Sequence, residues 1–241
     1  MRRFYASPAQ FQAGFITLSA DETRHLREVL RLREGAGVQV FDGEGREFAC
    51  LIEKIAKKET SLRIQEEISP TALESGLILT FGIALLKGEK FDLVVQKAVE
   101  LGVTKLVPLL TKHCDIKIRD VKDVEKRLER WRKIALEAAK QSGRARLMRI
   151  ESPIEFGKFI STAAGAKILF AERGGESFSG IAAGKEITAI TGAEGGWEDS
   201  EIEEARAENF QIITFGGRIL RAETAAIVAA GILQNHFGDL K

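Results

Sequence analysis

The chain has 241 residues, enough for one large domain or two smaller ones with an ample hydrophobic core. Hydrophobic residues make up 44% and charged residues 29%, as in an ordinary soluble globular protein, and the longest apolar stretch (77–86) is too short to cross a bilayer. The net charge of +1 excludes a uniformly basic chain, but residues 87–149 carry 17 basic and 9 acidic side chains. This basic block favours a polyanionic partner, although a solvated helix surface would give the same pattern.

The cysteine content argues against a zinc ribbon or a disulfide framework. Cys50 and Cys114 lie far apart and form no CxxC pair, which favours a reducing compartment. His113, beside Cys114, lacks further ligands at a suitable spacing, so no metal is expected. The amino terminus contains no apolar run of signal-peptide length, and we therefore expect a cytoplasmic protein with no membrane partner.

The first seventy residues predict a small β-rich module. Residues 38–52 form two apolar runs joined by an Asp-Gly-Glu-Gly turn, the pattern of a β-hairpin. Before them, residues 21–33 predict a short helix that ends at Gly35. The apolar face of this helix is expected to contain Leu26, Val29 and Leu30.

A basic stripe is predicted on another face of the same helix. Arg24, Arg27 and Arg31 stand at positions i, i+3 and i+7, so they are expected to align. With Arg2 and Arg3 near them in sequence, these side chains could contact phosphates. A solvated surface would explain the same pattern equally well.

Residues 66–76 contain Ser, Pro, Thr and Gly together and predict a linker. Beyond it, strands and helices alternate, which indicates a mostly parallel sheet with helices on both faces. The predicted strands are 77–85, 104–110, 147–150, 167–171, 187–191 and 211–215. The predicted helices are 90–101, 122–142, 154–163, 200–208 and 222–237.

The long helix 122–142 has one apolar seam, and the rest of its surface carries many Lys and Arg side chains. It runs into the basic stretch 141–146, where Gly143 is a natural C-cap. A basic helix followed by an arginine-rich loop that includes Arg144 is a reasonable edge for phosphate contacts.

Two glycine-rich loops follow predicted strands near the carboxyl terminus: TGAEGGW (191–197) and FGGRILRAETA (215–225). Ligands in open α/β sheets bind beyond the carboxyl ends of the strands, so we expect both loops to border one site. Neither loop contains a phosphate-binding lysine or a GxGxxG motif, and Glu194 would repel a pyrophosphate. The first loop therefore suits a neutral or cationic ligand, such as an adenosine bearing a sulfonium, although a structural tight turn would also explain its glycines.

The second loop places Arg218, Arg221 and Glu223 at the start of an alanine-rich helix. Polar groups at a helix N-terminus beside a glycine loop suit a polar ligand or a developing charge. The competing explanation is that Glu223 or Thr224 caps the helix.

The pair TGAEGG and GGRILRAETA resembles the signature of the RsmE family of the SPOUT superfamily, methyltransferases that act on N3 of a uridine in small-subunit (16S) ribosomal RNA. The resemblance covers nearly the whole chain, because several separate motifs stand in the family's order. These motifs are RRFY at the amino terminus, HLREVLRLREG (25–35), KGEKFDLVVQKAVELGV (87–103), QSGR (141–144) and HFGD (236–239).

The resemblance implies an α/β fold with a PUA-like, β-rich RNA-binding domain (1–70) and a SPOUT methyltransferase domain with a C-terminal trefoil knot (74–241). It also implies an S-adenosylmethionine cofactor, a homodimer whose protomers complete each site, and the ribosomal RNA of the small ribosomal subunit as partner. Carried over position by position, the cofactor residues are Leu169, Phe170, Ala171, Glu172, Thr191, Gly192, Glu194, Gly195, Gly196, Phe215, Gly216, Gly217, Ile219 and Leu220.

The chain departs from the family pattern at three positions. Ala193 and Gly217 stand where the family has prolines, and Ala222 stands where it has a threonine. Because proline fixes φ and restricts the unfolded chain, both loops are expected to be looser here. The charged residues of the loops are retained, so an active enzyme is still expected.

Methyl transfer from a sulfonium needs no metal, but the enzyme must align the reactants and help to remove the imide proton of uracil. Our hypothesis assigns stabilisation of the developing uracil anion to Arg221, with Arg218 as the alternative. Glu223 either orients that arginine or accepts the proton.

The candidates for contacts with RNA phosphates are Arg2, Arg3, Arg24, Arg27, Arg31, Lys87, Lys90 and Arg144. Few aromatic residues are available to stack on single-stranded bases, so a folded RNA or the assembled small subunit is the expected substrate. Two alternatives stay open: a related methyltransferase of transfer RNA or another ribosomal position, and a non-catalytic RNA-binding module whose glycine loops are structural.

Overall fold

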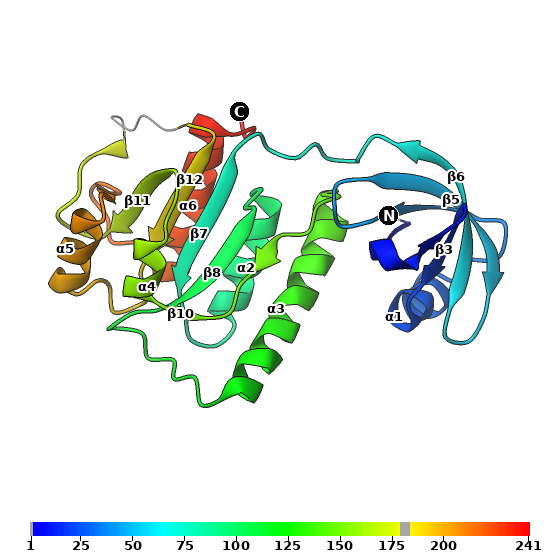
Figure 1. Ribbon diagram of the computed structural model, residues 1–241, viewed down its shortest axis with the longest axis horizontal. Helices are drawn as coiled ribbons and strands as arrows, with labels where there is room; N and C mark the ends of the chain where they lie inside the picture. Colours follow the sequence, from blue (N-terminus) through cyan, green and yellow to red (C-terminus); the bar gives the residue numbers. More distant parts are fainter. Residues whose placement is uncertain (1, 179–183) are drawn as a thin grey trace. The chain divides into compact units, whose positions relative to one another are not determined.

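The structure of the protein, a computed structural model, describes residues 2–178 and 184–241. The chain divides into two compact units, which can be followed by residue colour in Figure 1. One unit comprises Met1–Glu74 with Leu136–Leu147, and the other comprises Ser75–Ala135 with Met148–Lys241. Residues 136–147 thus belong to the first unit although they follow the linker in sequence, which no sequence pattern had indicated.

The first unit is built on a six-stranded sheet, in which β1 and β4 pair in parallel and the other described pairs are antiparallel. In sheet order its strands are β1 (Arg3–Tyr5), β4 (Gly37–Phe41), β5 (Glu47–Ile55), β6 (Thr60–Ile68), β3 (Phe15–Leu18) and β2 (Phe11–Gln12), and a short 3₁₀ helix, η1, covers Pro8–Gln10. Alternate strand residues fill its core, including Phe4, Val40 and Leu62, which are fully buried. The predicted β-rich module is confirmed.

The hairpin predicted over residues 38–52 is also confirmed, since β4 and β5 pair antiparallel. Asp42 organises its turn, because its Oδ1 accepts hydrogen bonds from the backbone N–H groups of Glu44 at 2.7 Å and Arg46 at 3.1 Å. Gly43 has a φ of +80°, a conformation that other residues rarely adopt.

The helix predicted over residues 21–33 is shorter than expected. Helix α1 covers Ala20–Arg24, a π-helical turn (η2) follows at His25–Val29, and the helical structure ends there. Arg31 has a φ of +49° and lies outside the helix, so the predicted basic stripe does not extend to it. Val29 is 64% exposed and does not belong to the apolar face, because the π-helical turn changes the angular spacing of its residues.

The second unit contains a seven-stranded sheet in which all described pairs are parallel. In sheet order its strands are β10 (Ile154–Glu155), β8 (Lys105–Leu110), β7 (Ile78–Ala84), β12 (Glu186–Thr191), β11 (Ala166–Ala171) and β13 (Gln211–Thr214), and β9 (Arg149–Ile150) pairs with β8. Its described α-helices are α2 (Lys90–Glu100), α4 (Phe156–Ser161), α5 (Asp199–Ala207) and α6 (Ala222–Phe237), together with the part of α3 (Val121–Ser142) that precedes Leu136. The predicted alternation is confirmed; β10 differs, because its residues were expected to begin a helix.

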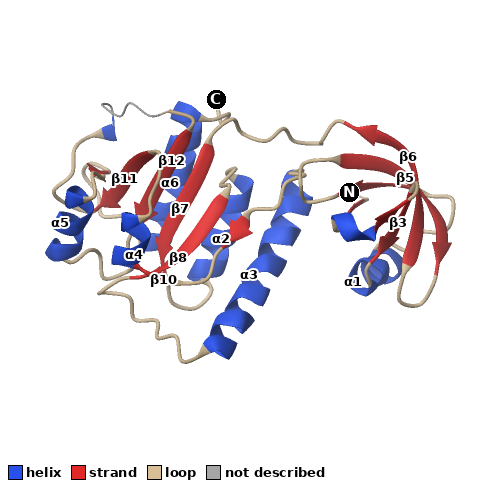
Figure 2. Cartoon of the chain, in the orientation of Figure 1, coloured by secondary structure: helices blue, strands red, loops and turns tan. Residues whose placement is uncertain are grey.

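Helices cover the parallel sheet, as Figure 2 shows by colour. Helices α4 and α5 share a buried cluster with residues of β8, β11, β12 and β13. Helix α2 packs against α6, and α6 also contacts β12. Within residues 2–178 and 184–241, none of the helices combines the length and apolarity that crossing a bilayer requires.

The strand order determines where a ligand site can form in the second unit. Strand β12 lies between β7 and β11, and β11 lies between β12 and β13. Because these neighbours are parallel, the segments that follow them leave the sheet at one edge. The two glycine loops, which follow β12 and β13, therefore meet at that edge beside the segment after β11.

Candidate functional site

A cavity of about 430 Å³ lies at this edge, and volumes of about 300–1,000 Å³ are typical of small-molecule sites. It is lined by residues 170–172 at the end of β11, by residues 191–197 after β12, by Phe215, 218–223 and Ala225 after β13, and by Lys90 of α2. The two glycine loops thus border one site, as their places in the sequence led us to expect.

Most of the residues that we predicted to hold a cofactor line this cavity. They are Phe170, Ala171, Glu172, Thr191, Gly192, Glu194, Gly195, Gly196, Phe215, Ile219 and Leu220, and the predicted catalytic residues Arg218, Arg221 and Glu223 lie in the same wall. Leu169 does not line the cavity, because it is fully buried in the hydrophobic core. Gly216 and Gly217 are exposed and also lie outside the lining.

The first glycine loop turns tightly around Trp197. This residue is 1% exposed, and its Nε1–H donates to Phe170 O at 2.9 Å, which ties the loop to the end of β11. A Cβ on Gly192 would lie 3.0 Å from the indole ring, so a larger residue would displace it. Gly196 has a φ of +71°, and its N–H donates to Ala193 O at 3.0 Å. The glycines therefore let the loop approach its own tryptophan as well as the cavity.

Glu194 projects from this loop to the start of α2. Its Oε1 accepts hydrogen bonds from the backbone N–H of Lys87 at 3.1 Å and from Lys90 Nζ at 3.0 Å. Partial burial by itself would raise the pKa of Glu194, but these hydrogen bonds hold that pKa below its ordinary value. The ionised carboxylate therefore links the loop to α2 and neutralises Lys90.

The second loop ends at the N-terminus of α6. Arg221 is the N-cap residue with extended backbone, and its carbonyl accepts the N–H of Ala225 at 2.8 Å. Arg218 and Arg221 are both exposed, and among the described residues neither guanidinium has a partner. Both side chains are therefore available to an anionic group at the cavity.

Two buried polar atoms in the cavity wall lack a hydrogen-bond partner among the residues that the structure describes. They are Thr191 Oγ1 and Glu223 Oε2. Such atoms are rare, because leaving one unpaired costs about 1–3 kcal/mol. A ligand that carries hydroxyl, amino or ammonium groups has the donors that these two atoms lack. No group of three or more His, Cys, Asp or Glu in the described part of the chain is placed to hold a metal ion.

Gly217 and Ala193, which stand where the family has prolines, have different backbone conformations and surroundings in the structure. Gly217 has a φ of +81°, which proline cannot adopt because its ring holds φ near about −65°. The second loop therefore follows a course that the family's proline would not permit. Ala193 is 6% exposed and bridges to Gly196, so the first loop is fixed by contacts of its own.

Most of the predicted RNA contacts are accessible. Arg2, Arg24, Arg27, Arg31 and Lys87 are exposed, whereas Lys90 is half-buried beside the cavity. Arg24 pairs with Asp21 at 3.0 Å, and Lys87 Nζ lies 2.6 Å from Asp115 Oδ2. Surface pairs of this kind are weak, so they do not prevent contacts with phosphates.

The prediction that Arg3 and Arg144 contact RNA is wrong. Arg3 is 3% exposed, and its Nε donates to Glu47 Oε1 at 2.7 Å, while its other nitrogens donate to backbone carbonyls. Arg144 is 5% exposed, and its Nη2 donates to Glu74 Oε2 at 2.7 Å. Both guanidinium groups are buried and paired within the first unit, where they join segments that are distant in sequence.

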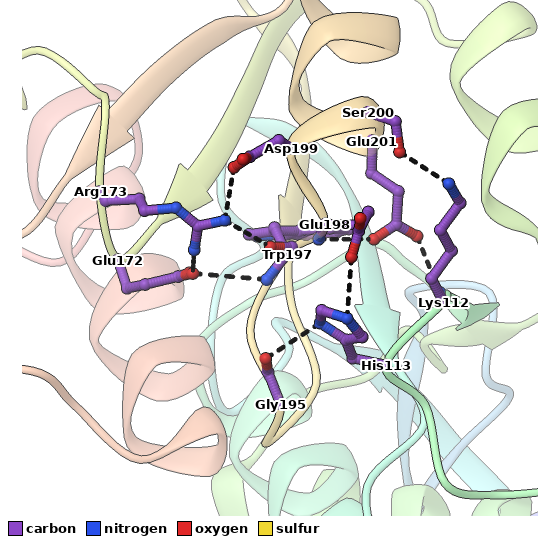
Figure 3. A network of polar contacts seen from close by, with 10 residues as sticks. All are labelled: Lys112, His113, Glu172, Arg173, Gly195, Trp197, Glu198, Asp199, Ser200 and Glu201. Carbon is purple, nitrogen blue, oxygen red and sulfur yellow. Dashed lines mark hydrogen bonds and ion pairs between the residues drawn. The ribbon is translucent and has the colours of Figure 1, made fainter.

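Our sequence reasoning missed a polar network beside the first glycine loop (Figure 3). Arg173 donates to Trp197 O at 2.8 Å and to Asp199 Oδ1 at 2.7 Å. On the other side of the loop, His113 Nδ1 lies 3.1 Å from Gly195 O. Only the position of these residues after the carboxyl ends of β11 and β8 could have indicated the network, because the partners are far apart in sequence.

Comparison with protein families gives two matches. A family of RNA methyltransferase domains matches residues 74–234, and a family of RNA methyltransferase PUA domains matches residues 18–65. The second match confirms the PUA-like prediction for the amino-terminal module.

Relatives and solved structures resemble this chain over nearly its full length. The ribosomal RNA small subunit methyltransferase E of Synechocystis is 35% identical over 94% of this chain and 75% of that protein, and that of Rickettsia conorii is 32% identical over 94% and 92%. The enzyme of the same name from Neisseria gonorrhoeae, bound to S-adenosyl methionine, has a TM-score of 0.91 and 30% identity, with 100% of both chains covered. A Legionella pneumophila methyltransferase with bound SAM has a TM-score of 0.92 and 32% identity over 99% of both chains. The chain therefore belongs to the RNA methyltransferase family of the ribosomal RNA small subunit methyltransferases E, the family that its motifs resemble.

Proposed function

We propose that the protein uses S-adenosylmethionine to methylate N3 of one uridine in 16S ribosomal RNA, on the assembled small subunit in the cytoplasm. The observation that carries the proposal is the cavity between the three loops, with Arg218, Arg221 and Glu223 in its wall. The names of the relatives support the ribosomal RNA substrate, and the SAM bound in two structural neighbours supports the cofactor.

Several groups in the cavity wall suit S-adenosylmethionine, which supplies a methyl group on a positively charged sulfonium. Phe170 and Phe215 stack with their ring centroids 4.9 Å apart and offer apolar surface to an adenine ring. Thr191 Oγ1 is unpaired among the described residues and can exchange hydrogen bonds with the polar groups of the cofactor. The first glycine loop adds backbone N–H and C=O groups without side chains that would fill the cavity.

The charged residues at the start of α6 act on the uracil ring in this proposal. Removal of the N3 proton leaves a negative charge on the ring, which an arginine at the site stabilises. Arg221 takes this role and Arg218, from the same loop, is the alternative. Glu223 lies in the first turn of α6 with its Oε2 unpaired among the described residues, so it can accept the proton or orient the arginine.

RNA binding and catalysis belong to different parts of the chain in this proposal. Residues 1–70 form the PUA-like RNA-binding domain, and residues 74–241 form the methyltransferase domain. The exposed side chains of Arg24, Arg27 and Arg31 make phosphate contacts from the first domain. In the second domain, Lys87 and Lys90, at the start of α2, are the candidates for phosphate contacts, and Lys90 also lines the cavity.

The proposal also includes a C-terminal trefoil knot and a homodimer. Residues 215–221 lead from the edge strand β13 back to α6, which contacts α2 and β12, so the chain recrosses the sheet beside the first glycine loop. Ile219 is 87% exposed in the cavity wall, and an exposed apolar side chain at a polar site is well explained by a partner subunit that covers it.

The test combines cofactor binding with mapping of the product. Isothermal titration with S-adenosylmethionine should show one site per chain, and incubation with small subunits from cells that lack the protein should yield N3-methyluridine at one position of 16S ribosomal RNA. Free 16S ribosomal RNA serves as the matched substrate control. Methylation of transfer RNA or of another ribosomal position would replace the proposed substrate, and the absence of any cofactor binding would favour a non-catalytic RNA-binding module.

A further inference from the structure

One side chain joins the segment after β8 to two points of the first glycine loop and its exit. His113 Nδ1 lies 3.1 Å from Gly195 O, and His113 Nε2 lies 3.0 Å from Glu198 Oε2. Gly195 lines the cavity, and Glu198 is the N-cap residue of α5. The imidazole therefore connects the cavity wall to the start of α5, as Figure 3 shows.

The surroundings of the imidazole hold it in place. A Cβ on Gly195 would lie 2.8 Å from His113 Cβ, so the loop and the histidine are in direct contact at that point. The backbone on both sides is anchored by Glu201, which is 3% exposed and accepts the N–H of Lys112 at 2.9 Å and the N–H of Glu198 at 3.1 Å. A shift of the ring would therefore be transmitted to the carbonyl of Gly195 rather than absorbed by its own segment.

The two partners of the ring are both acceptors. A carbonyl oxygen and an ionised carboxylate can only accept hydrogen bonds, and a neutral imidazole carries a single N–H. Both contacts of His113 can therefore form together only when the ring is protonated and has an N–H at each nitrogen. A neutral ring must give up either the glycine loop or the start of α5.

The charged groups around the ring come from three elements. Glu198, at the start of α5, faces Nε2 directly. The carboxylate of Glu201 is occupied by backbone N–H groups, Lys112 Nζ donates to a serine hydroxyl at 2.7 Å, and the carboxylate of Glu194 is paired with the start of α2. Among the described residues, Glu198 is thus the charged side chain that contacts the ring.

We propose that His113 is a positioning residue for the cofactor: in its protonated form it fixes Gly195 and the loop that holds S-adenosylmethionine, and cofactor affinity falls when the ring loses its proton. This inference rests on the proposed function, because it takes S-adenosylmethionine as the ligand of the cavity. His113 does not line the cavity and acts through Gly195.

The experiment measures the Kd of S-adenosylmethionine for the full chain by isothermal titration from about pH 6 to about pH 8.5. In the native protein, Kd should rise about three- to tenfold across this range, a modest factor because the side chains of His113 and Glu198 are both half-exposed. His113→Gln should bind more weakly at the lower pH and show a flat profile. His25→Gln, in the first unit, is the matched control and should keep the rise.

Glu198→Gln provides a second variant, because its amide can donate to the Nε2 of a neutral ring. In this variant the rise in Kd between about pH 6 and about pH 8.5 should be smaller than in the native protein, and its Kd near pH 8.5 should match that of the native protein at the same pH. Hydrogen–deuterium exchange of residues 192–198 without cofactor gives a readout independent of binding. After correction for the intrinsic effect of pH, this segment should open as pH rises in the native protein and show no such change in His113→Gln.

A His113→Gln variant that keeps the native rise in Kd and the native exchange profile would overturn the inference. If the native protein bound no S-adenosylmethionine at any pH, the proposed function would fail. The exchange measurement would then still decide whether His113 positions the loop.

Discussion

Replacement of Thr191 by valine should stabilise the ligand-free protein and weaken its binding of S-adenosylmethionine. Thr191 is 1% exposed, and its Oγ1 has no hydrogen-bond partner among the described residues. Valine has nearly the same shape but no hydroxyl, so the change removes an unpaired buried polar atom without opening a cavity. The two effects have opposite signs because we expect the bound cofactor to supply the partner that this hydroxyl lacks in the free protein.

The magnitude follows from the cost of the unpaired hydroxyl, about 1–3 kcal/mol. Because Thr191 stands at the cavity wall, we expect the lower end, a rise of about 1 kcal/mol in the free energy of unfolding. Loss of one hydrogen bond of about 1 kcal/mol from the complex should raise the Kd of S-adenosylmethionine about fivefold.

Thr188→Val on the same strand is the matched control. Thr188 is 3% exposed, but its Oγ1–H donates to Ala164 O at 2.7 Å, so this variant should lose about 1 kcal/mol of stability and keep its cofactor affinity. Urea unfolding at one protein concentration without cofactor, together with isothermal titration, measures both quantities. If Thr191→Val were destabilised as much as Thr188→Val, the hydroxyl of Thr191 would be satisfied in the free protein and the reasoning would be refuted.

Four further predictions concern catalysis, RNA binding and stability. Arg221→Ala and Glu223→Gln should each lower the methylation rate by about 100-fold or more and change the Kd of the cofactor only a few-fold. The reason is that the two native side chains act on the developing charge of the uracil ring and on its proton. Near-normal rates in both folded variants would contradict these roles. RNA binding should weaken steeply between about 50 and 200 mM salt, with a shallower slope in Arg24→Ala. Arg3→Ala should lower stability by about 3–5 kcal/mol, because the buried carboxylate of Glu47 loses its charge partner although it retains hydrogen bonds from Thr71; a native unfolding midpoint in this variant would speak against this. The pKa of Glu194 is lowered in the folded protein, so its contacts stabilise the fold at pH values above the ordinary carboxyl range. This stabilisation is lost as pH falls through the lowered pKa. Glu194→Gln should therefore flatten the acid limb of the profile of unfolding free energy against pH, measured by urea unfolding.

Periodicity predicted the strands and helices of the second unit, apart from β10. Buried parallel strands appear as short apolar runs and amphipathic helices repeat about every 3.6 residues, so both patterns are local. The helix over residues 21–33 was predicted too long, because spacing carries no information about the π-helical turn at His25–Val29 or the left-handed conformation of Arg31. The transfer of residues 136–147 to the first unit depends on contacts with distant segments.

The sequence by itself determined the α/β class with its β-rich amino-terminal module, and its motifs determined the family. It also determined the two loops that border the cavity, because parallel strands always present their carboxyl ends at one edge. The tertiary structure alone decided which charged side chains remain available. Arg3 and Arg144 are the same residue type as Arg24, yet they pair in the interior with Glu47 and Glu74.

The same reason explains why the sequence could not show the contacts of His113 with Gly195 and Glu198. A histidine one residue before a cysteine gave no metal pattern, and its partners Gly195 and Glu198 are separated from it by many residues. Local patterns report the neighbours of a residue within one element, whereas hydrogen bonds and ion pairs form between segments that meet only when the chain folds. The motifs therefore predicted which chemistry the protein carries, and the folded structure determined which side chains hold the site in place.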